Sequence, residues 1–273
     1  MAHASQERYS ALVDAKLRAT LVTRDNTIFN NRYEGSPKAG KVKIPVRDTE
    51  VAVKAYDKAN GVDADAGTTT YLDLDIDNDE AVNEIIDGFD AASVPDDITA
   101  ERLDSAGYSL ALQMETDASA ELVTGGTAMD STAALTKANI YDTIVDARTK
   151  LSETHVPTDG RWLLVSPETY ALLLKSPEFI KASALGDAVV QTGAVGRVAG
   201  FTVFEDTTLG EKVDFIAGHP NWFTRIEEWS EPVAVNDLKG SGTFIGACAV
   251  QGRKIYAHKV TKAQTLYIKR IEA

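Results

Sequence analysis

Hydrophobic and polar residues change their spacing several times along the chain, and each change marks a different expected element. In residues 4–22 the apolar side chains recur every three or four positions, as in an amphipathic helix. The apolar stripe consists of Tyr9, Leu12, Val13, Leu17 and Leu21. This pattern predicts either a first core helix or an arm that packs on a neighbouring subunit, and the sequence leaves both open.

After Gly35 the spacing changes to two, which is typical of strands with one buried face. The apolar positions are Val42, Ile44, Val46, Val51, Val53, Leu72, Leu74 and Ile76. A polar, glycine-containing segment at 57–67 separates the two runs and predicts a loop tip. We therefore expect a long antiparallel hairpin with strands of about ten residues. An isolated two-stranded ribbon is only marginally stable in water, so its apolar face must lie on this chain or on another copy.

The remaining pattern predicts alternating helices and strands. A helix from about Ile98 to Val123 follows acidic start signals and ends at two glycines, which gives a length of roughly 39 Å. A second helix is expected at 136–154, and a third begins at Ser166-Pro167. Strands are expected at 161–165, 201–204, 213–217, 244–250, 253–260 and 265–271. This order of elements predicts the α+β class.

Charge narrows the possible functions. The 273 residues carry a net charge of −13, and residues 63–104 alone hold 14 acidic residues and one basic residue, Arg102. A general nucleic-acid binder is therefore not expected. The sequence contains no run of about 18 apolar residues for a membrane span, and no signal peptide is expected. Cys248 is the only cysteine, so no intrachain disulfide can form.

No motif predicts catalysis or a resident cofactor. Asp73–Asp79 with Glu84 has the spacing of a calcium loop, but Asn78 stands where that loop needs glycine. Leu74 and Ile76 also give the segment the alternation of a strand. The four histidines form no metal-binding pair. We therefore expect no metal site, no cofactor and no enzymatic activity.

Taken in order, the expected elements resemble those of the major capsid proteins of tailed bacteriophages, whose fold was first seen in phage Hong Kong ninety-seven. The resemblance covers essentially the whole chain, and the segment Arg197–Glu205 is similar to the turn and strand that enter the axial domain in that family. The resemblance implies an N-terminal arm at 1–35, an extended β-hairpin loop at 36–80, a peripheral domain with a spine helix at 81–200, an axial domain at 201–240, and closing strands at 241–273 that return to the peripheral domain.

The resemblance also implies a function. It predicts a coat protein of the virion that self-assembles into hexamers and pentamers of an icosahedral head around double-stranded DNA. Its partners would be itself, a separate scaffold protein and a portal, without a membrane, and assembly would take place in the bacterial cytoplasm. Two alternatives stay open: the shell of an encapsulin-type nanocompartment, and a calcium- or ligand-binding α+β protein.

Contacts between copies are expected on the arm and the hairpin. In this hypothesis the apolar hairpin face lies on a neighbour, and the acidic residues pair with basic residues of other copies. Replacing Leu72 and Leu74 with Asp should then leave the monomer folded and block assembly. The residues expected at these contacts are Leu12, Leu17, Lys41, Lys43, Arg47, Lys54, Leu72, Asp73, Leu74, Asp75 and Asp77.

Overall fold

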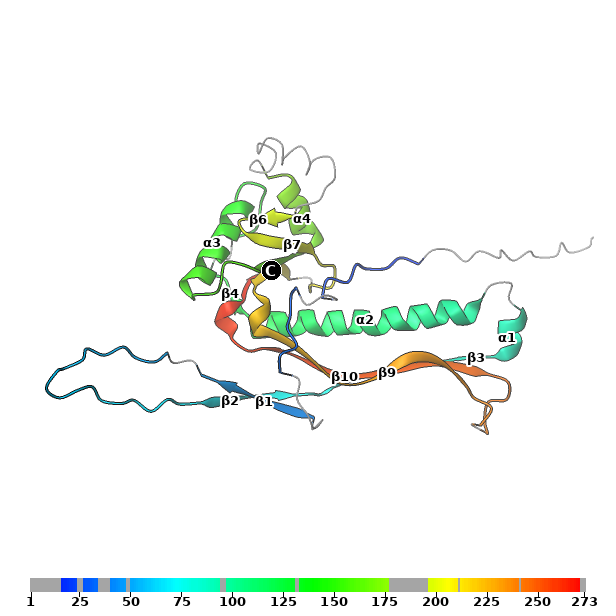
Figure 1. Cartoon of the computed structure of the whole chain (residues 1–273). Coiled ribbons are helices and arrows are strands. Elements are labelled where there is room, and N and C mark those ends of the chain that lie inside the picture. The colour runs from blue at the N-terminus through cyan, green and yellow to red at the C-terminus, as the bar shows by residue number, and fades with distance from the viewer. Residues whose placement is uncertain are drawn as a thin grey trace, which may run out of the picture.

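The computed structural model describes residues 16–23, 27–33, 40–47, 50–93, 97–130, 133–176, 196–210, 212–240 and 242–270. One long helix lies along a narrow sheet, a lobe of helices and strands rises at one end, and a loop projects beyond that end (Figure 1). The elements are β1 Lys41–Val46, β2 Thr70–Asp75, β3 Asn78–Ile86, α1 Gly88–Ser93, α2 Ile98–Gly125, β4 Thr127–Ala128, α3 Ile140–Glu153, β5 Trp162–Val165, α4 Pro167–Leu174, β6 Arg197–Val198, β7 Phe201–Glu205, β8 Val213–Gly218, η1 Pro220–Trp222, β9 Phe223–Asp237, β10 Cys248–Val260, η2 Ala263–Thr265 and β11 Tyr267–Arg270. The expected α+β class is confirmed.

The long helix is α2, and its prediction from the sequence is confirmed. Its 28 residues span about 42 Å. The Asp97 carboxylate caps the start by accepting the backbone N–H of Ala100 at 3.1 Å. Leu110 and Met114 are buried, and α2 lies over the antiparallel sheet β3-β10-β9 (Figure 1). Helix and sheet together form the long axis of the subunit (Figure 1).

The lobe contains a six-stranded sheet of order β4-β11-β8-β5-β7-β6, with α3 and α4 packed against it. Strand β5 is buried along its whole length, as its continuous apolar sequence predicts. The Ser166 hydroxyl caps α4 by accepting the N–H of Thr169 at 3.3 Å. The core of the lobe includes Ile144, Leu151 and Phe215, all fully buried.

The hairpin is shorter than its sequence pattern suggests. Strands β1 and β2 pair antiparallel with Val42 opposite Leu74 and Ile44 opposite Leu72, so the expected apolar face exists. However, β1 ends at Val46 and β2 begins at Thr70, so each strand has six residues. The prediction of about ten residues per strand is wrong. Beyond them the chain forms a projecting loop (residues 50–69) held by a single backbone bridge between Asp57 and Gly61. Without a surface to cover one face, alternation alone does not maintain a ribbon.

The N-terminal segment is not helical where it is described. Residues 16–23 form an extended strap along α2, while residues 1–15, including Leu12, lie outside the described residues. Side chains of α2 bind the backbone of the strap, so its N–H groups do not form helical hydrogen bonds. The expected helix is therefore wrong for residues 16–23, whereas an arm that packs on a neighbouring subunit stays a prediction, since Leu17 is exposed.

The sheets divide the chain differently from the expected domain boundaries. In the expected axial segment 201–240, β7 and β8 belong to the lobe, whereas β9 pairs with β10 under α2. The closing segment is also split, because β10 joins the narrow sheet and β11 the lobe. The expected break between strands near Gly252 is absent. A Cβ there would lie 2.7 Å from Cγ2 of Val233, so this glycine permits a close approach of β10 to β9 and is not a turn.

Candidate assembly surfaces

The projecting loop extends from one end of the molecule (Figure 1), and its apolar side chains are exposed. Val51 is 92% exposed, Val53 is 100% exposed, and Tyr56 and Val62 are also exposed. The Lys54 ammonium bridges the two sides of the loop through Asp65 Oδ1 at 2.6 Å and the Asp63 carbonyl at 3.0 Å. A cluster of uncovered apolar residues on a projection is the usual mark of a surface that binds another chain.

The ribbon base (β1 and β2) has the opposite environment. Ile44 and Leu74 are 2% and 1% exposed, and they pack against Ile226 of β9 and Ala257 of β10. Leu72 is partly buried in the same cluster. Leu74 therefore has almost no exposed surface for a neighbouring copy, whereas the contact expected at the partly buried Leu72 stays a prediction. The face of the narrow sheet that lies away from α2 is apolar at this point and buries them within the subunit.

The charged residues of the ribbon base also find partners within the chain. Lys41 Nζ lies 2.9 Å from Asp73 Oδ2 and 3.1 Å from Asp75 Oδ1. These hydrogen bonds raise the pKa of Lys41, and the one to Asp73 lowers the pKa of that carboxyl. Within the subunit these residues pair with one another, because antiparallel pairing places them side by side on one face, and their contact with another copy stays a prediction.

The other expected contact residues lie on the surface. Arg47 Nε donates to Thr69 Oγ1 at 3.2 Å at the start of the projecting loop. Lys43 and Asp77 are exposed, and Leu17 is fully exposed on the strap. Asp79, at the end of the suspected calcium loop, lies in β3 and pairs with Arg253. Asp73 and Asp75 thus share Lys41, whereas Asp79 and Glu84 bind Arg253 and Arg102, and the described residues contain no group of side chains suited to hold a metal ion.

At the opposite end of the narrow sheet lie α1 and the turn between β9 and β10 (Figure 1), and both carry an exposed apolar residue. Phe89 of α1 is 79% exposed, and Ile245, in the turn between β9 and β10, is 94% exposed. The two segments adjoin, since a Cβ on Gly88 would lie 2.1 Å from the carbonyl oxygen of Gly246. Sequence reasoning missed this cluster. The available signal was Phe244-Ile245, an apolar pair inside a turn otherwise made of glycine, serine and threonine.

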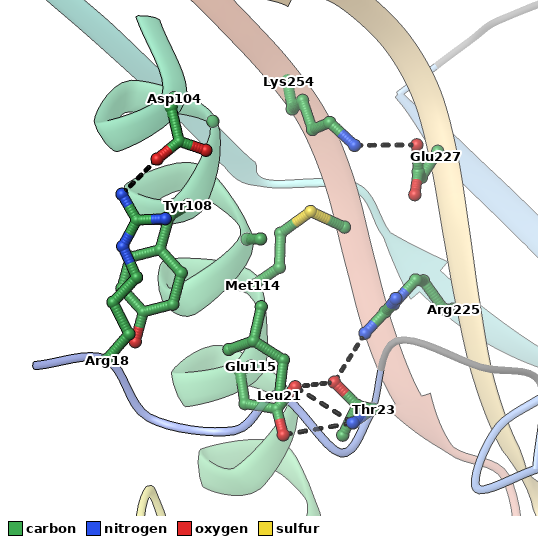
Figure 2. A pocket seen from close by; sticks show the side chains of 12 residues that line it. Arg18, Leu21, Thr23, Asp104, Tyr108, Met114, Glu115, Arg225, Glu227 and Lys254 are labelled. Atoms are coloured by element: carbon green, nitrogen blue, oxygen red, sulfur yellow. Dashed lines mark hydrogen bonds and ion pairs between the residues drawn. The ribbon is translucent and has the colours of Figure 1, made fainter. Parts of the chain in front are cut away.

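A cavity of about 540 Å³ lies between the strap, α2 and the strands β9 and β10 (Figure 2). Its inner wall holds three buried polar side chains, Thr23, Glu115 and Arg225. Burial raises the pKa of the Glu115 carboxyl, although hydrogen bonds from the strap oppose the shift. Burial lowers the pKa of Arg225. The sequence gives no sign of this network, because its members are separated by many residues.

Among the described helices, none combines the length and apolar character that a membrane crossing requires. Cys248 lies at the start of β10 and is half-buried against an apolar cluster.

Comparisons with known proteins agree with this architecture. A family model described as "Phage capsid protein" matches residues 83–260, from β3 to the end of β10. A search of the curated proteins gives no match. The family match favours a capsid role over the encapsulin and calcium-binding alternatives.

Solved structures with the same fold come from several phages. A structure from Mycobacterium phage Che8 has a TM-score of 0.82 at 23% identity, covering 97% of this chain and 96% of that one. The capsid structure of cyanophage P-SCSP1u has a TM-score of 0.82 at 12% identity, covering 98% and 93%. The mature capsid of bacteriophage PhiM1 has a TM-score of 0.73 at 16% identity, covering 98% and 92%. With a family match over more than half of its length, the chain belongs to the phage capsid protein family and is a major capsid protein.

Proposed function

We propose that this chain forms the hexamers and pentamers of an icosahedral phage head that encloses double-stranded DNA. The observation that carries the proposal is the projecting loop, whose apolar residues Val51, Val53 and Tyr56 have no cover in the subunit. Burying them against a second copy would remove apolar surface from water, which is the main driving force for association. Closed assemblies repeat one such contact by symmetry.

The contact is assigned to the loop and not to the ribbon base. Arg47 is exposed at the root of the loop and Lys43 is exposed further along β1, and both belong to the polar rim in this proposal, while Asp77 is exposed at the opposite end of the ribbon base and would meet a different part of the neighbour. Lys54 shapes the tip through Asp65, and Leu17 adds an exposed apolar residue on the strap. In the assembled shell the lobe would face the centre of each capsomer, and α2 with the narrow sheet would form its periphery.

The role is purely structural in this proposal, without a catalytic step. A separate scaffold protein and a portal would direct assembly in the bacterial cytoplasm. The net charge of −13 supports contact with packaged DNA that is neither strong nor sequence-specific.

Electron microscopy of the purified protein, with and without a scaffold protein, tests the proposal. Replacing Val51, Val53 and Tyr56 together with Ser should leave the subunit folded and abolish rings and shells, because only exposed residues change. The control replaces Ala52 and Ala55 of the same loop with Ser and should assemble normally. A wild-type chain that stays monomeric at high concentration with scaffold supplied would contradict the proposal. If the triple variant forms normal shells, the projecting loop is not the contact that drives assembly.

A further inference from the structure

The strap (residues 16–23) follows α2 in the same direction as the helix. At an extended rise of about 3.3 Å per residue it covers roughly 23 Å. The helix rises about 21 Å between Glu101 and Glu115. The strap is therefore almost fully extended, and each of its residues passes about two residues of the helix. The contacts in order are Lys16 with Glu101, Arg18 with Asp104, Ala19 N–H with Tyr108 Oη at 2.7 Å, and Thr23 with Glu115.

The outer and inner ends of the strap are held in different ways. At the outer end, Arg18 pairs with Asp104 at the surface and lies over the Tyr108 ring at 4.9 Å. Exposed ion pairs of this kind contribute little to stability. At the inner end Thr23 is 1% exposed and Glu115 is 2% exposed. The inner contact therefore decides whether the strap stays bound.

The inner contact places one hydroxyl between two opposite charges (Figure 2). The Glu115 carboxylate accepts the backbone N–H groups of Val22 and Thr23 at 2.8 and 3.0 Å, and it accepts the Thr23 hydroxyl. The same hydroxyl oxygen accepts Nη2 of Arg225 at 3.0 Å. Glu115 and Arg225 are thus linked through Thr23, with a separation of no more than two consecutive hydrogen bonds.

Arg225 has fixed partners that do not depend on the strap hydroxyl. Its Nε donates to His258 Nε2 at 2.9 Å, and its guanidinium lies 3.9 Å from the centre of the Phe29 ring. Burial and the nearby Arg225 lower the pKa of His258 to about 3, so His258 stays neutral and accepts this hydrogen bond. Arg225 therefore keeps its position on β9 when the Thr23 hydroxyl is removed.

We propose that residues 16–23 are a releasable strap, latched at Thr23, and that Glu115 and Arg225 pair directly when the strap leaves. A buried carboxylate that loses all its partners is strongly unfavourable, which would normally prevent release. Here the opposite charge lies one hydroxyl away, and the adjoining cavity of about 540 Å³ gives the Glu115 side chain room to move. Residues 16–23 can therefore leave α2 while the rest of the subunit stays folded.

Amide hydrogen exchange on the full chain, kept unassembled at low concentration, tests the latch. Thr23→Val keeps the size of the side chain and removes the shared hydroxyl. Exchange of residues 16–23 should rise by about tenfold or more, as expected for lost hydrogen bonds to a charged group, while exchange in α2 and β10 stays unchanged. Thr20→Val makes the same substitution at an exposed strap position and should leave exchange as in the wild type.

Three outcomes would overturn the proposal. Strap exchange in Thr23→Val could equal that of the wild type, Thr20→Val could produce the same increase, or Thr23→Val could increase exchange throughout the chain. The last result would make the strap part of the core. If the Thr23→Val chain fails to fold, the strap is likewise part of the core and the proposal is wrong.

The direct pairing is tested by a double-mutant cycle between Glu115→Gln and Arg225→Gln, measured by denaturant unfolding. In the Thr23→Val background the coupling between these residues should exceed that in the wild type by about tenfold, expressed as a ratio of unfolding constants. An unchanged or smaller coupling would show that the two charges do not close on each other, and would contradict that half of the proposal.

Discussion

The projecting loop and the ribbon base both carry alternating apolar and polar residues, but they have opposite environments. Val53 is fully exposed, whereas Leu74 is packed against β9 and β10. The difference arises from what lies beneath each segment. The ribbon base crosses the apolar end of the narrow sheet, and the loop extends beyond the subunit (Figure 1). Alternation therefore identifies an apolar face but does not say which chain covers it.

The largest effect is expected at Leu74. Leu74→Asp would bury a carboxylate beside Ile226 and Ala257 and should lower the free energy of unfolding by about 3–5 kcal/mol. Val53→Asp makes the same change on the loop and should shift stability by less than about 0.5 kcal/mol. Denaturant unfolding of both variants checks the contrast. Similar losses for the two would contradict it.

A second prediction extends the comparison to ionisable groups, because the buried His258 should affect stability where loop charges do not. Its pKa is lowered to about 3 from an ordinary 6.5, so the unfolded chain binds a proton that the folded chain does not. Stability should be fully present above about pH 6.5 and fall by up to about 1.4 kcal/mol per pH unit as the pH drops towards 3. Unfolding measured from pH 7 to 5 should show this slope in the wild type. His258→Gln should lose it, and an equal slope in both chains would exclude His258 as its source.

A smaller effect is expected from replacing two glycines, Gly252 in the buried part of the narrow sheet and Gly67 in the projecting loop. Gly252→Ala would place a Cβ 2.7 Å from Cγ2 and 3.1 Å from Cα of Val233, and this crowding should cost about 1–3 kcal/mol. Gly67 in the projecting loop has no atom within 4 Å of the same position, so Gly67→Ala should be nearly neutral. Thermal unfolding compares the two variants. A neutral Gly252→Ala would mean that β9 and β10 separate easily at this point.

Local signals explain which parts of the fold could be predicted. α2 has a capping carboxylate at Asp97, and β5 is continuously apolar, so each carries its own evidence in a few adjacent residues. β9 was missed because only Phe223–Ile226 is continuously buried, and the rest of the strand lies at the edge of its sheet with exposed polar residues. Pro232 near the register shift of β9 also reads as a break, although proline is tolerated on an edge strand.

The acidic segment at 63–104 shows that the sequence also does not reveal the partners of charged residues. Its excess was expected to act between copies, yet Asp73, Asp79 and Glu84 pair with Lys41, Arg253 and Arg102 of the same chain. Two further acids in α2 bind the strap, Glu101 through Lys16 and Asp104 through Arg18. Pairing between residues so far apart depends on the fold, so the sequence alone does not locate it.

The central claim is that the projecting loop, exposed in the subunit, is covered by another copy in the shell. The most direct test places a thiol at Val53 in a Cys248→Ser background and compares its maleimide reactivity in subunits and in assembled particles. Labelling should be rapid in the subunit and at least about tenfold slower in the shell. Equally rapid labelling in both states would contradict it.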